Sequence, residues 1–403
     1  MTFAKYRNIV RIQPMATKKR RIFMDYASTT PPSRRVLSAM EPFFSKNYAN
    51  PSAIYSEGTL ARSFVENSRR SVARMLGSRA DEVVFTGSGT ESINLAIIGL
   101  FGKVKGNINK PHLIVSSIEH PAVLESARVV RDSGGEVTML KVNSDGVVSP
   151  SDVKAALKQS TFLVSIMQAN NEIGSIQPIK EIGRIIREFR SSKTTDSNFP
   201  YFHTDSGQSV NYCPVNVNQL GVSLLSLDAS KIYGPKGVGI LYIKRGMEVE
   251  PIIVGGGQEG GIRSGTENVA GIVGMAEALV ETSNLRVKES KRLTALRDYC
   301  ISEILKNFPK AKLNGPVKNR LPNNVNICFT GIDAEFAVIK LNKAGIMCSS
   351  GSSCRNLNEN SMSYVVSALG RANCAKSSLR FSFGRSTGKS DIDFLVVALK
   401  KII

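Results

Sequence analysis

Residues 222–243 have the sequence VSLLSLDASKIYGPKGVGILYI, and this stretch decides the fold. One apolar run ends at Leu227, a lysine and a glycine-rich turn follow, and a second apolar run begins at Val238. Short apolar runs bounded by turn residues are typical of buried strands, so we predict two successive strands of a parallel sheet. Lys231 then lies at a strand end, where open α/β sheets bind ligands. A lysine beside a glycine turn is usually only a solvated charge, so the hypothesis of a Schiff-base lysine depends on the rest of the chain.

The length and composition are those of a globular enzyme. The chain has 403 residues, of which 42% are hydrophobic and 21% are charged, which favours about two domains. No apolar run is long enough to predict a membrane span. The first 22 residues are basic but lack the apolar core of a secretory signal. We therefore expect a cytoplasmic protein, with an organellar matrix as the alternative.

The net charge and the cysteines indicate which binding partners, metal sites and disulfides to expect. The net charge of +20 could attract acidic proteins or nucleic acid. The basic residues are spread along the chain, so we expect no direct nucleic-acid binding. The six cysteines form no Cys-x-x-Cys pair and there are three histidines, so we predict no metal site. We infer a reducing compartment and no disulfide scaffold.

Strands alternate with helices over the first two thirds of the chain, which predicts a mainly parallel sheet. A long helix, about 268–308, then leads to a smaller α+β region with strands near 325–329, 346–348 and 379–382. We predict an N-terminal segment, 1–32, that joins the small domain, a large domain, 33–280, and a small domain, 281–403. The expected strands of the large domain are 81–85, 113–116, 137–140, 162–167 and 201–204, and its helices include 33–44 and 58–76.

A phosphate-binding turn is predicted at residues 86–92, TGSGTES, where a strand becomes a helix. Free amides at a helix start and neighbouring hydroxyls can bind an oxyanion. The alternative is an ordinary capped helix. The segment is not a Walker loop, because no Gly-Lys-Ser/Thr follows.

Two further polar residues follow predicted strands. Asp205 could accept a hydrogen bond from a protonated ring nitrogen, although turn aspartates are common. His120 could lie against a planar cofactor and exchange protons with substrate, although a lone histidine is more often structural. Because the ends of neighbouring parallel strands meet, we expect Asp205, Lys231 and the turn 86–92 at one edge of the sheet. His120 also follows the carboxyl end of a predicted strand.

The C-terminal third supplies a thiol and a cation. Residues 348–354, CSSGSSC, form a small-residue segment, and Cys354 is the better nucleophile candidate because the neighbouring Arg355 favours its thiolate. Incidental cysteines in a tight loop are the alternative. Arg380 lies in an alternating strand and suits a carboxylate ligand, with a surface salt bridge as the alternative.

Taken together, these stretches resemble the cysteine desulfurases of the class V aminotransferase-like family, which are fold type I pyridoxal-phosphate enzymes. The resemblance covers almost the whole chain from Met24. It implies an α/β fold with a mainly parallel large domain, a smaller α+β domain, and a homodimer. The matching segments are 25–31, 50–52, 90–92, 119–120, 170–174, 205–208, 231–237, 255–259, 263–266, 349–352 with Cys354, and 380–382.

Carried over residue by residue, the resemblance implies a pyridoxal 5'-phosphate enzyme that converts L-cysteine to L-alanine and keeps the sulfur as a persulfide. The sulfur would go to an iron–sulfur scaffold or a tRNA-thiolation carrier. The implied roles are Lys231 for the Schiff base, Asp205 for the pyridine nitrogen, Gln208 for the ring hydroxyl, His120 for stacking, Gly89, Thr90 and Thr266 of the partner subunit for the phosphate, Asn171 and Arg380 for the substrate carboxylate, and Cys354 for attack on sulfur.

The chain departs from the family beside Lys231. Asp228 and Ser230 stand where the family has serine and histidine facing the phosphate, and residues 87–89 are Gly-Ser-Gly where Ser-Gly-Ala is usual. A carboxylate beside a phosphate dianion is repulsive unless it turns away or is protonated. Ser230 could offer one compensating hydrogen bond to the phosphate. We predict weaker cofactor affinity with the chemistry retained.

Other functions remain open at this stage. The same fold supports selenocysteine or cystine lyases and aminotransferases. A degenerate scaffold that binds acidic partners or RNA through the +20 charge is a hypothesis of a different class. The presence of Lys231, Asp205, His120 and Cys354 together favours an enzyme.

Overall fold

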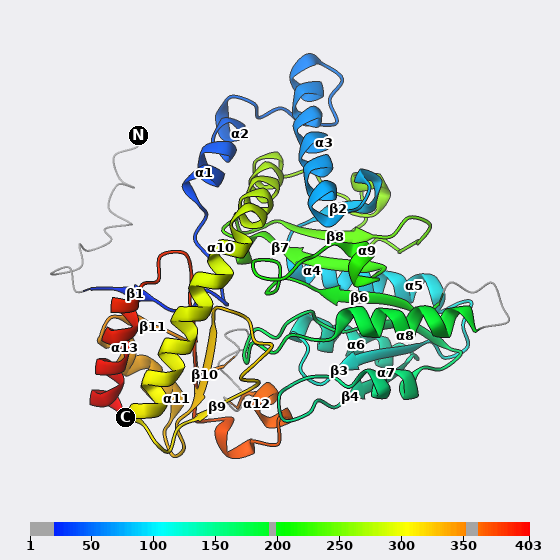
Figure 1. Ribbon diagram of the computed structural model, residues 1–403. Helices are drawn as coiled ribbons and strands as arrows, with labels where there is room; N and C mark the ends of the chain where they lie inside the picture. Colours follow the sequence, from blue (N-terminus) through cyan, green and yellow to red (C-terminus); the bar gives the residue numbers. More distant parts are fainter. Residues whose placement is uncertain (1–19, 193–198, 352–361) are drawn as a thin grey trace, which may run out of the picture.

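A seven-stranded sheet forms the centre of the larger part of the molecule (Figure 1). The structure is a computed structural model, and it describes residues 20–192, 199–351 and 362–403. The strand order is β2-β8-β7-β6-β5-β3-β4. The strands are β2 (Val83–Thr86), β3 (His112–Ser116), β4 (Glu136–Leu140), β5 (Thr161–Ser165), β6 (Tyr201–Asp205), β7 (Leu224–Asp228) and β8 (Gly239–Ile243).

The central strands are apolar because both faces of the sheet are covered. Every residue of β3 and of β5 is buried, as expected for parallel strands enclosed between helices. The pairs β3–β4, β3–β5, β5–β6 and β6–β7 are parallel. The predicted α/β class with a mainly parallel sheet is confirmed.

One predicted strand direction is wrong. β8 pairs antiparallel with both β7 and β2, whereas we expected the strand after Lys231 to continue the parallel sheet. Ten residues separate Asp228 from Gly239, and a parallel crossover needs about a dozen or more. The short connection therefore forces the chain to turn back.

Helices flank the sheet and begin and end at recognisable residues. The Asn268 side chain accepts a hydrogen bond from the Gly271 N–H and starts the longest helix, α10 (Val269–Asn307). The predicted helix 33–44 is divided, because Pro42 cannot donate the hydrogen bond that would continue it. The other helices and helical turns of the larger part include α1 (Arg34–Met40), α2 (Pro42–Ser45), α3 (Ser56–Leu76), α4 (Gly89–Asn94), η3 (Leu95–Gly99), α5 (Leu100–Val104), α6 (Pro121–Asp132), α7 (Pro150–Ala156), α8 (Ile179–Ser191), α9 (Val217–Leu220) and η4 (Ala229–Lys231).

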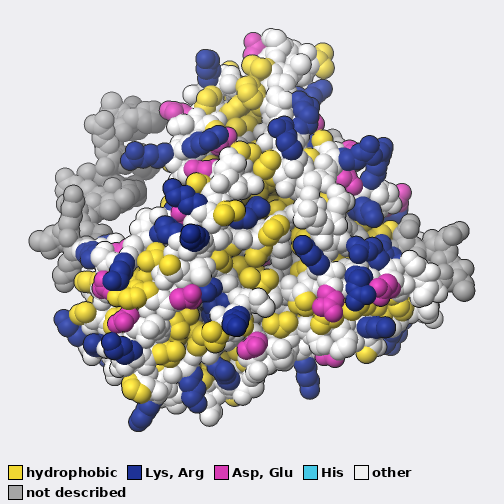
Figure 2. Space-filling view, in the orientation of Figure 1, with side chains coloured by type: hydrophobic (Ala, Val, Ile, Leu, Met, Phe, Trp, Pro, Cys, Tyr) yellow, Lys and Arg dark blue, Asp and Glu magenta, His cyan; other side chains and the backbone are white. Residues whose placement is uncertain are grey.

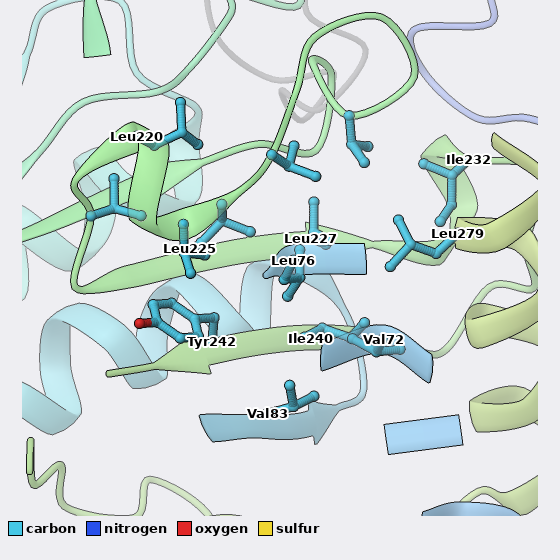
Figure 3. Close-up of a cluster of buried hydrophobic side chains, with 14 of the residues drawn as sticks. Val72, Leu76, Val83, Leu220, Leu225, Leu227, Ile232, Ile240, Tyr242 and Leu279 are labelled. Atoms are coloured by element: carbon cyan, nitrogen blue, oxygen red, sulfur yellow. The ribbon is translucent and has the colours of Figure 1, made fainter. Parts of the chain in front are cut away.

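The largest apolar cluster fixes the strands next to Lys231. Leu225 and Leu227 of β7 belong to the same buried cluster as Leu76 of α3 and Leu279 of α10 (Figure 3). Burial of one such side chain stabilises the fold by about 1.5–3 kcal/mol. This packing holds β7 rigidly, so the turn that follows it has a fixed position.

A smaller sheet region lies at the other end of α10 (Figure 1). β1 pairs in parallel with β11, and β10 pairs antiparallel with both β12 and β9. The predicted domain boundary at 280/281 falls inside α10, and the division into domains stays a prediction. The elements are β1 (Ile22–Phe23), β9 (Lys312–Leu313), β10 (Asn324–Cys328), α11 (Ala334–Lys343), β11 (Ile346–Met347), α12 (Tyr364–Ala368), η6 (Ala372–Cys374), β12 (Ser378–Ser382) and α13 (Lys389–Ile402).

A disulfide bond links two segments of this smaller region. Cys328 at the end of β10 is bonded to Cys374 in the turn after α12. Cysteines paired across 46 residues carry no local spacing signal, so no sequence pattern predicts the bond. Our expectation that the cysteines would form no disulfide framework needs this correction.

The charged side chains are distributed over the surface. On the face shown in Figure 2, Lys and Arg side chains are spread over the whole surface, singly or in small groups, with acidic side chains among them. Within residues 20–192, 199–351 and 362–403, no helix has both the length and the apolar character needed to cross a membrane.

Candidate functional site

A cavity of about 160 Å³ lies where several strands of the large sheet end. The side chains that line it come from segments far apart in the chain, as expected at the carboxyl edge of a parallel sheet. The lining residues are Ala27, Ser28, Gly89, Thr90, Ile93, His120, Met167, Asn171, Asp205, Gly207, Gln208, Asp228, Lys231 and Arg380.

Lys231 reaches this cavity from the short helical turn η4. Its Nζ donates a hydrogen bond to the Ser28 carbonyl. Segment 28–30 also holds the turn, because the Thr30 N–H donates to the Ser230 carbonyl at 2.7 Å and the Tyr233 N–H donates to the Thr30 hydroxyl at 2.7 Å. Tyr233 has φ 63°, a conformation that few side chains adopt without such support. Segment 28–30 therefore positions Lys231.

Asp205 ends β6 and faces the same cavity. One carboxylate oxygen accepts a hydrogen bond from the Gly207 N–H at 2.9 Å. Burial raises the pKa of Asp205 above its usual range, while the charge of His120 and the Gly207 N–H act in the opposite direction. A cation bound beside this carboxylate would further favour its charged form.

His120 stands at the start of α6. Its Nδ1 accepts a hydrogen bond from the Ala122 N–H at 3.1 Å, so the neutral ring carries its proton on Nε2. The preceding residue, Glu119, is fully buried. Burial raises the pKa of Glu119 to about 8, opposed by hydrogen bonds from Ser116 and Met167. The site thus holds a ring nitrogen that can exchange a proton, and the residue before it in the chain carries a buried carboxyl group.

The predicted phosphate turn is occupied by protein groups. The Gly89 N–H donates to Asp228 Oδ2 at 2.9 Å, and the Glu91 N–H donates to the Ser88 hydroxyl at 3.1 Å. The Ser230 hydroxyl donates to Asp228 Oδ1 at 2.6 Å. The Asp228 carboxylate therefore does not turn away from the predicted phosphate turn. The Ser230 hydroxyl, which we expected to donate a hydrogen bond to the phosphate, donates to Asp228 instead.

Arg380 and Asn171 close another side of the cavity. Arg380 is 1% exposed, and its Nη2 donates to Asp25 at 2.7 Å. Its Nη1 donates to the Asn171 carbonyl at 3.3 Å. A buried guanidinium held in this way is preorganised to meet a carboxylate.

The structure brings most of the predicted site residues together. Gly89, Thr90, His120, Asn171, Asp205, Gln208, Lys231 and Arg380 line one cavity. Ser230 and Thr266 are not among the residues that line it. Thr266 is exposed, and Cys354 lies outside the described residues.

Several lining residues were missed from the sequence. Ser28 contributes a backbone carbonyl, and carbonyls leave no sequence signal. Met167 follows β5 closely, so the rule that ligands bind at the carboxyl ends of strands could have found it. In the described part of the chain, no group of three or more His, Cys, Asp or Glu side chains is placed to hold a metal ion.

Comparisons with known proteins identify the family of this chain. The aminotransferase class-V family matches residues 22–395. A curated cysteine desulfurase IscS of Dictyoglomus turgidum is 44% identical, covering 96% of this chain and 95% of the relative. The IscS of Methanosarcina thermophila is 41% identical, covering 96% and 93%.

Solved structures give the same result. A NifS-like protein has a TM-score of 0.87 at 32% identity, covering 95% of this chain and 99% of its own. SspA in complex with cysteine has a TM-score of 0.76 at 33% identity, covering 90% and 98%. The chain therefore belongs to the class V aminotransferase family and, within it, to the cysteine desulfurases.

Proposed function

We propose that this chain uses pyridoxal 5'-phosphate to convert L-cysteine to L-alanine and keeps the sulfur on Cys354 as a persulfide. The observation that carries the proposal is the cavity itself, where Lys231, Asp205 and His120 arrive from three different segments. An amine, a carboxylate and a ring with a free proton in one cavity suit chemistry on an amino acid.

The donor set fits the cofactor's ring. Lys231 would hold it covalently, Asp205 would accept from its ring nitrogen, and His120 would lie against its face. When bound, the cofactor supplies an electron sink for bonds broken at the substrate's carbons. Gln208, whose Nε2 donates to the Ala27 carbonyl at 2.8 Å, would contact the ring hydroxyl. The amides of Gly89 and Thr90 would meet the phosphate, and at that end the fit is poorer because of Asp228.

The chain's own groups account for substrate binding and sulfur transfer. Arg380 and Asn171 would orient the substrate carboxylate, and His120 would exchange a proton through Nε2. The Cys354 thiolate would attack the substrate sulfur, so that an S–S bond forms as the substrate C–S bond breaks. The carbon product becomes alanine by gaining a proton, and no external oxidant is required.

A homodimer is part of the proposal, because Thr266 would act in the other subunit. Two strongly exposed apolar side chains adjoin a hollow whose lining includes Glu267, the residue after Thr266. Residues 51–52 and 256–260 border this hollow of about 710 Å³, and the adjoining segments expose Ile54 at 97% and Val254 at 80%. Large exposed apolar patches are typical of interfaces. Light scattering of the purified chain should give twice the monomer mass.

The closing experiment is a persulfide assay. The chain is incubated with L-cysteine without reductant. The mass of the peptide that contains Cys354 is then measured by mass spectrometry, and released alanine is measured in parallel. We expect one added sulfur on that peptide, lost in Cys354→Ala. Cys348→Ala is the matched control, since burial raises the pKa of the Cys348 thiol to about 12 and a protonated thiol is a poor nucleophile.

Two outcomes would contradict the proposal. Alanine release with an unmodified Cys354 would favour a lyase, and no alanine with salt-sensitive RNA binding would favour a scaffold. The onward acceptor, for which we propose an iron–sulfur scaffold or a tRNA-thiolation carrier, is tested by moving labelled sulfur from the persulfide to each purified candidate.

A further inference from the structure

The carboxylate of Asp228 joins the end of β7 to the start of α4, two elements that lie side by side (Figure 1). Oδ2 accepts from the Gly89 N–H at 2.9 Å. Oδ1 accepts from the Ser230 N–H at 2.8 Å and from the Ser230 hydroxyl at 2.6 Å. All three donors are uncharged groups, so they hold the carboxylate in place without neutralising it.

The Gly89 amide is the first of a long helical run. Helix α4 continues through η3 into α5 without a break, from Gly89 to Val104. Backbone N–H groups at such a start favour an anion. In this chain an anion belonging to the protein already has that position, and it also lines the cavity.

Gly89 makes this contact sterically possible. A methyl group at residue 89 would lie 3.0 Å from the Cβ of Asp228 and 3.2 Å from its Oδ2. Any side chain there would crowd the carboxylate. The glycine and the aspartate therefore form one local arrangement, although they lie 139 positions apart in the chain.

Two other charged side chains in this region are already paired. Glu91, in the first turn of α4, forms an ion pair with Arg263 at 2.8 Å. Arg380, across the cavity, is paired with Asp25 at 2.7 Å. Lys231 is the amine that the proposed function assigns to the cofactor. A phosphate dianion entering the start of α4 would therefore meet the charge of Asp228 directly.

We propose that Asp228 is an internal anion that competes with the cofactor's phosphate for the Gly89 amide. The phosphate then adds little to cofactor affinity in this chain, and the ring contacts supply most of it. The inference rests on the proposed use of pyridoxal phosphate. It goes further by separating the contribution of the phosphate from that of the ring.

The test compares two ligands that share the ring and differ in the phosphate. Full-length apoprotein is titrated with pyridoxal phosphate and with pyridoxal, and Schiff-base absorbance gives each Kd. The ratio of the pyridoxal Kd to the pyridoxal phosphate Kd reports the phosphate contribution alone. In Asp228→Ser this ratio should rise at least about tenfold over wild type, as expected when a charged group gains a hydrogen bond. The pyridoxal Kd should stay nearly the same.

Two further variants sharpen the comparison. Asp228→Asn keeps the shape without the charge and should raise the ratio by a smaller factor, because its oxygen can still accept from Gly89. Asp132→Ser removes an exposed charge on α6, where Asp132 pairs with Arg128, and should leave the ratio unchanged. Unaltered pyridoxal binding in each variant shows that the site is folded.

The outcomes separate the two proposals. A ratio that does not rise in Asp228→Ser, with Schiff-base absorbance present, overturns the competition and leaves the proposed function intact. No absorbance that depends on Lys231, with either ligand, overturns both. A rise of the same size in Asp132→Ser would also overturn the inference, because it would show a general charge effect.

Discussion

Glu119 should make the stability of this protein fall as the pH rises. The side chain is fully buried and accepts hydrogen bonds from the Ser116 hydroxyl at 2.5 Å and the Met167 N–H at 3.0 Å. Burial raises its pKa from 4.5 to about 8. The folded chain therefore keeps a proton that the unfolded chain releases, and stability is lost between these two pH values. At about 1.4 kcal/mol per pH unit, the total loss is about 5 kcal/mol.

Glu119→Gln tests this reasoning because glutamine keeps the shape and an acceptor oxygen but cannot ionise. We expect the variant to become more stable relative to wild type as the pH rises, so that the difference in thermal midpoint grows by roughly 5 °C from pH 5 to 8.5. Melting curves across this range give the difference directly. Glu125→Gln serves as the control, since Glu125 is 67% exposed in its ion pair with Arg128, and it should follow wild type.

The refuting result is a constant difference between wild type and Glu119→Gln at every pH. It would mean that the hydrogen bonds from Ser116 and Met167 hold the carboxylate charged despite its burial. A pH-dependent change of equal size in Glu125→Gln would equally refute the assignment to Glu119.

Three further results are expected. Reduction of the Cys328–Cys374 disulfide, which closes a loop of 46 residues, should lower the free energy of unfolding by about 4 kcal/mol. A thermal midpoint that is the same with and without reductant would contradict this. Arg380→Lys should raise the KM for L-cysteine roughly tenfold or more, because lysine lacks the bidentate fork; an unchanged KM would remove Arg380 from substrate binding. Burial lowers the pKa of His203 to about 3, so stability should fall as the pH drops below about 6.5, and His203→Gln should lose part of that sensitivity in acid melts.

The site could be predicted in outline because the chain marks it locally. Lys231 and Asp205 each follow an apolar run, and the ends of parallel strands meet at one edge. His120 follows the same rule. Local patterns therefore predicted which side chains would lie near one another, although the roles of these residues stay predictions until they are tested.

The direction of β8 could not be taken from its composition. Gly239–Ile243 is fully buried, and a buried run looks the same in either direction. The length of the connection from β7 carried the missing information. The disulfide between Cys328 and Cys374 was also hidden, because pairing across 46 residues depends on how β10 and η6 pack.

By itself the sequence determined the α/β class, the family and the chemical groups available to the site, since apolar periodicity and motifs are local properties. Only the tertiary structure decided what Asp228 does. Sequence placed a carboxylate near Lys231, but folding brought it within 2.9 Å of the Gly89 amide, 139 residues away. Contacts between distant segments follow from packing, which no local pattern encodes.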